Sequence, residues 1–303
     1  MTTVAPLTTT PPAAGGSPSA AAVAKRKLTS PWASLAAIVI AVLWTIPTFG
    51  LLVSSFRPER AIKTTGWWTF FSDPQVTLDN YRAVFDPEAI NLSDYFVNSM
   101  VICIPSVVIP LCLASLAAYA FAWVKFPGRD FLFIAIFALQ IVPLQVTLIP
   151  LLTLFNQAHL TNTFWTLWLA HSTFALPLAI YLLHNFMKEV PASLVEAARV
   201  DGAGHVAIFF RVMLPLMTPA LAAFGIFQFL WVWNDLLVAL TFAGGGTEVA
   251  PITLGLANLS GTRGTAWHLM SAGAFVSIIL PVTVFLLLQR YFVRGLLAGS
   301  VKG

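Results

Sequence analysis

Long hydrophobic runs without Asp, Glu, Lys or Arg dominate the chain, and short polar stretches separate them. Five such runs cover residues 28–56, 95–124, 131–187, 212–234 and 264–289. About 20 apolar residues let a helix cross the ~30 Å hydrocarbon core of a bilayer, so each run can supply at least one transmembrane helix. The pattern therefore predicts an all-α membrane protein.

The run over residues 131–187 is too long for one helix. Its one polar cluster lies at residues 156–162, with the sequence Asn-Gln-Ala-His-Leu-Thr-Asn. Because clusters of Asn, Thr and similar residues between apolar segments mark loops, we expect a turn there. The five runs therefore hold six transmembrane helices.

Composition supports a lipid environment. Of 303 residues, 58% are hydrophobic and 9% are charged, whereas a soluble domain has roughly 25% charged residues. Too few ionic groups remain to cover a water-exposed surface. The two cysteines, Cys103 and Cys112, would be about 13.5 Å apart along one helix, beyond the ~7 Å that a disulfide can span between Cα atoms.

The basic residues orient the six-helix arrangement, because cytoplasmic segments are enriched in Lys and Arg. With the N-terminus inside, eleven of the sixteen basic residues lie on the inner side. These are Lys25, Arg26, Lys27, Lys125, Arg129, Lys188, Arg199, Arg211, Arg290, Arg294 and Lys302. The outer side mixes its basic residues with acidic ones. We therefore expect both termini in the cytoplasm and a multi-pass protein of a prokaryotic inner or plasma membrane.

The chain divides into three predicted parts. They are a disordered cytoplasmic tail (1–27), a six-helix transmembrane domain (28–292) and a cytoplasmic C-terminal tail (293–303). Within the transmembrane domain lie an outer segment (57–94), a cytoplasmic loop (188–215) and an outer loop (242–268). The aromatic residues of the outer segment suit either the bilayer surface or contact with an external partner.

The cytoplasmic loop predicts two short helices joined by a turn. Ser193 followed by Glu196 has the spacing of a capping box at a helix start. Gly202 and Gly204 suit the end of that helix and a tight reversal, and a second helix leads to Pro215. The loop is rich in apolar residues, so either the bilayer interface or the groove of another protein covers it.

The same loop resembles the EAA loop of permease subunits of binding-protein-dependent ABC importers. The pattern is Glu196-Ala197-Ala198, three residues, Gly202, nine residues, then Val212-Met213-Leu214-Pro215, with Val212 in place of the usual Ile. Three other stretches are similar to the MalG-like subunit of the carbohydrate branch. They are Phe126-Pro127-Gly128-Arg129, Trp233-Asn234-Asp235, where Glu is frequent in place of Asp235, and the tail from Gln289, where Thr is usual in place of Leu297.

The resemblance implies a non-catalytic subunit of a sugar importer, with oligosaccharides as the expected class. Its partners would be a second permease subunit, two ATP-binding subunits that hold ATP-Mg, an extracytoplasmic solute-binding protein and the lipid bilayer, with no nucleic acid. This chain would bind no cofactor. The residues implied to couple to the ATPase are Glu196, Ala197, Ala198, Arg199, Asp201, Gly202, Leu214 and Pro215. Purely structural roles for Glu196 as a cap partner and Gly202 as a C-cap remain open.

The C-terminal tail carries a second implied contact. By the same resemblance, Gly299, Lys302 and Gly303 reach the ATPase interface. A frayed basic terminus is the alternative.

Polar residues inside membrane spans are costly and therefore mark pathway candidates. We expect this role for Gln140, Gln228, Asn234 and Asp235. Hydrogen bonding between helices is the alternative for the glutamines.

Other chemistries find little support. No P-loop occurs, since Gly244-Gly245-Gly246-Thr247 lacks the lysine and the spacing. The five histidines have no metal-ligand spacing, so we expect no metal site. A secondary transporter or channel acting alone is the alternative function, although such proteins usually show internal repeats.

Overall fold

The computed structural model describes residues 31–244, 246–260 and 266–298, and every regular element in these ranges is a helix. The chain divides after Leu51 into two units, each described by itself. The first unit consists of most of α2 (Pro31–Ser55), an apolar helix with Pro47 inside it. The predicted tail over residues 1–27 lies outside the described residues.

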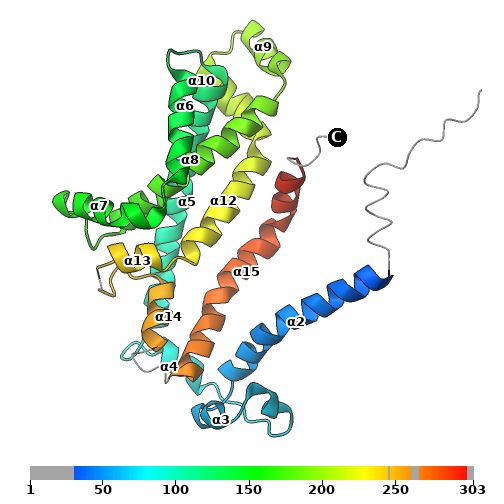
Figure 1. The fold of residues 1–303 in the computed structure, drawn as a ribbon, viewed down its shortest axis with the longest axis vertical. Coiled ribbons are helices and arrows are strands. Elements are labelled where there is room, and N and C mark those ends of the chain that lie inside the picture. Colours follow the sequence, from blue (N-terminus) through cyan, green and yellow to red (C-terminus); the bar gives the residue numbers. More distant parts are fainter. Residues whose placement is uncertain (1–30, 245, 261–265, 299–303) are drawn as a thin grey trace, which may run out of the picture. The chain divides into compact units, whose positions relative to one another are not determined.

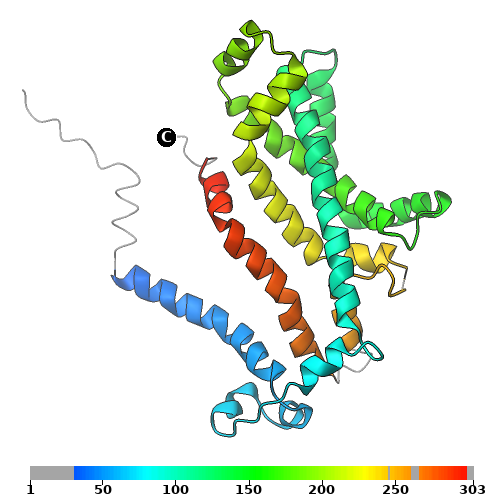
Figure 2. The ribbon, with the colours of Figure 1, turned by 180° about the vertical axis from the view of Figure 1, so that it is seen from behind.

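Long helices form the body of the second unit. α5 (Leu92–Trp123) packs along α8 (Phe164–Glu189) and against α12 (Thr218–Trp233), and α12 packs against α15 (Trp267–Ala298). Figures 1 and 2 show α5 running through most of this unit. α15 continues past Gln289, where the predicted sixth span ends, to Ala298.

The third predicted helix is broken. α6 (Arg129–Ala138) and a short η2 (Leu139–Ile141) are followed by α7 (Leu144–Gln157), and the two arms meet at 103°. Val142 is extended, with ψ 119°, because the ring of Pro143 disfavours the α region for the residue before it. The third predicted helix therefore forms as two arms instead of one continuous helix.

The span count depends on how bent helices are treated. Four described helices are long and apolar enough to cross a membrane singly. The count reaches up to six if α6 with α7, and the segment His205–Leu216 with α12, each form one span. The second pair bends by 71° next to Pro219, which α12 accommodates in its first turn.

The turn predicted at residues 156–162 is confirmed. α7 ends at Gln157 and α8 begins at Phe164. His159 and Asn162 both adopt positive φ, at 56° and 62°, which Asn tolerates better than most residues. The polar cluster thus reverses the chain between two apolar helices.

Short helices occupy the two ends of the second unit (Figures 1 and 2). At one end lie α3 (Glu59–Thr64), η1 (Trp67–Phe71), α4 (Asp79–Phe85) and α14 (Ile252–Ser260). At the other end lie α9 (Ala192–Val200) and α10 (His205–Ile208), which continues as the π-helix η3 (Phe209–Met213) and α11 (Leu214–Leu216). We call the segment from α9 to α11 the hook.

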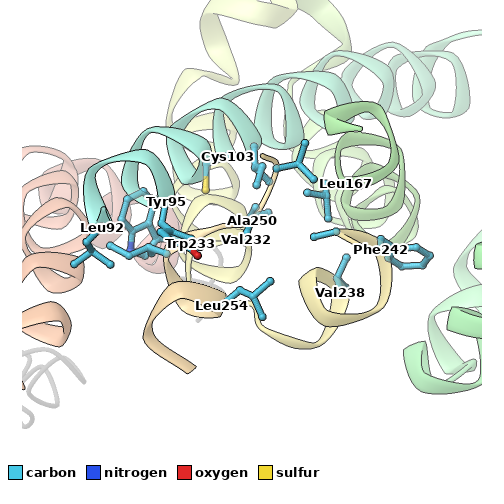
Figure 3. Close-up of a cluster of buried hydrophobic side chains, with 14 of the residues drawn as sticks. Leu92, Tyr95, Cys103, Leu167, Val232, Trp233, Val238, Phe242, Ala250 and Leu254 are labelled. Atoms are coloured by element: carbon cyan, nitrogen blue, oxygen red, sulfur yellow. The ribbon is translucent and has the colours of Figure 1, made fainter. Parts of the chain in front are cut away.

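Two apolar cores hold the second unit together. The loop-side cluster gathers side chains such as Leu92, Tyr95, Val232, Trp233 and Leu254 from α5, α12 and α14 (Figure 3). The hook-side cluster joins α5, α8, the hook and the start of α12. Each core therefore fixes one end of the bundle.

Candidate functional site

The hook reverses through a glycine in the left-handed region. α9 ends at Val200, and Gly202 has φ +83°, a conformation that costs other L-residues energy. The Ala203 N–H donates to the Ala198 carbonyl at 2.9 Å, the longer bond of a Schellman helix end. The predicted role of Gly202 as a helix terminator is confirmed, whereas Gly204 takes φ −75°.

The predicted capping box is wrong. α9 begins at Ala192 with Pro191 as its N-cap, and no side chain caps it. Ser193 therefore lies inside the first turn, where its hydroxyl cannot take the N-cap geometry that the motif needs. The Leu194 N–H instead donates to the Pro191 carbonyl at 3.1 Å. Glu196 is consequently free of the cap role.

The apolar residues of the hook separate into two faces. Val195, Ile208, Phe209 and Met213 are buried in the hook-side cluster. Facing outward are Leu194, Val200, Val206 and Phe210, with Val200 87% and Val206 72% exposed. The inner face fixes the hook to the bundle, and the outer face is available to something else.

A hydrogen bond also ties the hook to α5. The Tyr119 hydroxyl lies 2.9 Å from His205 Nδ1, and the Tyr119 ring packs edge-on against Phe209 with centroids 5.4 Å apart. This contact is not visible in the sequence, because its partners are 86 positions apart and neither residue stands out in a hydrophobic pattern.

The predicted coupling residues lie together on the hook. Six of them are exposed, namely Glu196, Ala197, Arg199, Asp201, Gly202 and Pro215. Ala198 and Leu214 are half-buried and pack against the hook-side cluster. Within the described part of the chain, no hydrogen bond or ion pair is recorded for the Glu196 carboxylate, so its charge faces solvent.

A cavity of about 760 Å³ opens between α7, α8 and α12. Three of the four predicted pathway residues, Gln140, Gln228 and Asp235, line it. Asn234 does not; its side chain is exposed and donates to the Leu230 carbonyl one turn back at 2.7 Å. The cavity also borders the break between α6 and α7, consistent with the rule that irregular backbone at membrane depth lines cavities.

Asp235 and His171 meet at one wall of this cavity. Asp235 Oδ2 accepts the Ala239 N–H at 3.2 Å and lies 4.0 Å from His171 Nε2. The Thr253 hydroxyl donates to the Asp235 carbonyl at 2.6 Å, which fixes the backbone. The Asp235 carboxylate thus meets the first turn of α13 (Leu237–Phe242), whose N-cap residue is Leu236.

Side-chain hydrogen bonds pin the loop before α14 to α5. The Asn98 amide donates to the Thr247 carbonyl at 3.1 Å and to the Ala250 carbonyl at 3.2 Å. The Ile252 N–H donates to the Ser99 hydroxyl at 2.7 Å. This part of the predicted outer loop is therefore held in one place.

The predicted outer segment is organised around a buried arginine. Arg57 is 3% exposed and donates to the Gly66 carbonyl at 2.8 Å, the Thr65 hydroxyl at 2.7 Å and the Thr69 hydroxyl at 3.0 Å. In the sequence, Arg57 stands out only as one of the basic residues on the outer side. On the neighbouring α3, a hydrogen bond from Lys63, together with the nearby His268, lowers the pKa of Glu59.

Two further predictions concern metal binding and the C-terminal tail. No group of three or more His, Cys, Asp or Glu residues within the described ranges could bind a metal ion. The C-terminal contact predicted for Gly299, Lys302 and Gly303 lies outside the described residues.

Comparisons with known proteins agree with one another. Residues 110–297 match the family described as "Binding-protein-dependent transport system inner membrane component". The osmoprotective compounds uptake permease protein GgtD of Synechocystis sp. is 52% identical, with 88% of this chain and 91% of the relative covered. The alpha-glucoside transport system permease protein AglG of Rhizobium meliloti is 49% identical over 83% of this chain and 67% of the relative.

A solved structure shares the fold. A chain of a bacterial ABC transporter involved in the import of the acidic polysaccharide alginate superposes with a TM-score of 0.68. It is 22% identical and covers 87% of this chain and 98% of its own length.

Proposed function

Because the chain belongs to the family of binding-protein-dependent transport system inner membrane components, we propose that it is a permease subunit of an ABC importer for a sugar. Oligosaccharides are the expected class. The name of AglG, a permease for alpha-glucosides, supports a sugar, and the name of GgtD, for osmoprotective compounds, supports a small polar solute. ATP would be hydrolysed on separate subunits, and this chain would be non-catalytic.

The geometry of the hook is the observation that supports coupling of this chain to a separate ATPase. It presents Glu196, Ala197 and Arg199 on an exposed face, while Val195 anchors the same helix in the hook-side cluster. A short helix fixed on one side and exposed on the other can transmit force as a body. In this proposal the exposed face enters a groove of the ATPase subunit.

A bulky substitution on the exposed face tests the docking. Ala197→Trp should leave membrane insertion unchanged but abolish ATP-linked uptake, because the indole cannot enter a groove fitted to a methyl group. Ala197 is preferable to Ala198, whose side chain already packs on the bundle. Ala158→Trp, at an exposed alanine in the turn between α7 and α8, is the control. Normal uptake by the Ala197 variant would contradict the docking.

The orientation is a proposal supported by the distribution of Lys and Arg. Six spans with both termini inside place the hook in the cytoplasm and the loop before α14 outside, in a prokaryotic inner membrane. A membrane-impermeant thiol reagent tests this: Glu196→Cys should react only in inside-out vesicles. Labelling from the exterior would contradict the orientation and the docking together.

The remaining partners follow from the same proposal. A second permease subunit would complete the pathway, a solute-binding protein would dock on the outer segment and the loop before α14, and Gly299, Lys302 and Gly303 would add an ATPase contact. Solute would pass along the cavity at Gln140, Gln228 and Asp235, with Asn234 beside it. ATP-independent transport by the purified chain alone would favour the stand-alone transporter instead.

A further inference from the structure

The cavity between α7, α8 and α12 has the chemistry of a ligand site. We propose that it is a binding subsite for a neutral sugar ring held by this subunit itself, a proposal that rests on the importer function above and deepens it. Its volume of about 760 Å³ falls within the roughly 300–1,000 Å³ of small-molecule sites, which join apolar walls with a few placed polar groups.

Two deeply buried polar side chains line the cavity with unused hydrogen-bonding capacity. His171 and Gln228 are each only 4% exposed. No hydrogen bond from another described residue reaches the His171 imidazole, and Gln228 makes one long bond, from Nε2 to the Ser106 carbonyl at 3.4 Å. Because buried polar groups are nearly always paired, these two call for a partner within the cavity. A sugar hydroxyl can both donate and accept, and so can satisfy either group.

An aromatic wall faces the same space. Phe227 and Trp231 stand one turn apart on α12, with ring centroids 5.8 Å apart, and both line the cavity. Trp231 is 53% exposed. A flat aromatic ring with a polar edge suits the apolar C–H face of a pyranose, whose hydroxyl groups then point toward the polar wall.

The charge pattern selects a neutral ligand. Asp235 is the one acidic residue lining the described cavity, and no Lys or Arg lines it. The Ala239 N–H, with the backbone amides of Leu237 and Val238, already meets the Asp235 carboxylate, and these dipoles offset part of its charge. Free lone pairs can still accept hydroxyl donors, whereas an anion would find no cationic partner. A lipid chain would offer no hydrogen-bond partner to the His171 imidazole or to the side-chain carbonyl of Gln228.

Protection from chemical labelling tests the subsite in the assembled importer. Thr173 lines the cavity and is exposed, so Thr173→Cys can be labelled with a membrane-permeant maleimide and followed by peptide mass spectrometry. Cys112, exposed on α5 and outside the cavity, is the internal reference. Trehalose and methyl α-glucoside are the sugar probes, and glycine betaine is the non-sugar control.

The sugars should slow labelling of Thr173→Cys several-fold and leave Cys112 unchanged, while glycine betaine should protect neither. His171→Leu and Trp231→Ala should each raise the half-protecting sugar concentration about tenfold. Trp165→Ala is the matched control, because Trp165 is 56% exposed and lies outside the cavity. It should leave protection unchanged.

No protection by either sugar, or equal protection by glycine betaine, would overturn the subsite. The ATPase activity of the same preparations separates this failure from failure of the importer proposal. If binding protein and sugar stimulate ATP hydrolysis while Thr173→Cys stays unprotected, the importer stands and the subsite is wrong. If no ATPase activity associates with the chain, the importer proposal itself fails.

Discussion

At the hook, helices meet the bundle mainly through buried apolar side chains. Within the described residues, Tyr119 of α5 hydrogen-bonds to His205, and the Thr218 hydroxyl at the start of α12 donates to the Pro215 carbonyl at 2.9 Å and to the Leu214 carbonyl at 3.4 Å. At the opposite end, Asn98 and Ser99 pin the loop before α14 through hydrogen bonds to its backbone. Apolar burial is non-directional, whereas hydrogen bonds depend on angle and distance. The loop is thus held in one register, whereas the mainly apolar contacts of the hook are compatible with the proposed movement of the hook as a body.

The largest effect should come from placing a charge in the apolar interface of the hook. Val195→Asp buries an unpaired carboxylate at a position that is 2% exposed, which should destabilise the assembly by about 3 kcal/mol or more and abolish uptake. Leu194→Asp, on the outer face of the same helix, should leave the thermal unfolding midpoint nearly unchanged. An equal fall of the thermal unfolding midpoint in both variants would show that the two faces of α9 do not differ.

At the opposite end of the second unit, the next largest effect should come from removing a polar side chain. Asn98→Ala deletes two hydrogen bonds to backbone carbonyls and should cost about 2 kcal/mol. Proteolysis of the loop in the purified protein should accelerate accordingly. Asn258→Ala, at an exposed position of α14, is the control and should change neither quantity. An unaltered proteolysis rate in the Asn98 variant would mean that the loop is held by other contacts.

A backbone effect should separate the two hook glycines. A Cβ at Gly202 or at Gly204 would meet no atom within 4 Å, but only Gly202 has positive φ. Gly202→Ala should therefore cost about 1–2 kcal/mol and lower ATP-linked uptake, while Gly204→Ala should be near neutral. Equal rates of ATP-linked uptake in the two variants would contradict the claim that uptake depends on the positive φ of Gly202.

The smallest effect should follow from cutting the tie between α5 and α10. Tyr119→Phe removes the hydrogen bond to His205 and keeps the ring contact with Phe209, at a cost of about 1 kcal/mol. If the tie helps transmit movement, solute carried per ATP hydrolysed should fall more than ATP hydrolysis itself. Tyr181→Phe, on α8, is the control. A proportional fall in both rates would assign Tyr119 a purely structural role.

Local sequence pattern predicted much of the fold. The apolar runs locate α2, α5, α8, α12 and α15, and the polar cluster at residues 156–162 locates a turn. The loop resemblance is confirmed by the family match over residues 110–297. These features depend on neighbouring residues and on composition, which a single sequence contains.

The features that the sequence did not predict depend on residues that are far apart in the chain or on competing local effects. Ser193 and Glu196 have the spacing of a cap, but Pro191 sets the helix start first. Pro143 breaks the apolar run over residues 131–187, but the 103° angle between the two arms cannot be read from the sequence. The cavity needs α7, α8 and α12 in place before His171 and Asp235 face each other.

The π-helical winding of η3 (Phe209–Met213) has a consequence for length variation in this chain. A π turn holds an additional residue compared with an α turn. Deleting the exposed Phe210 would let the segment rewind as ordinary α-helix and keep Met213 and all of α12 in phase with their neighbours. The same one-residue deletion within α12 would rotate everything beyond it by about 100°, turning Gln228 or Trp231 away from the cavity. A single-residue gap is therefore tolerable at η3 but not within α12.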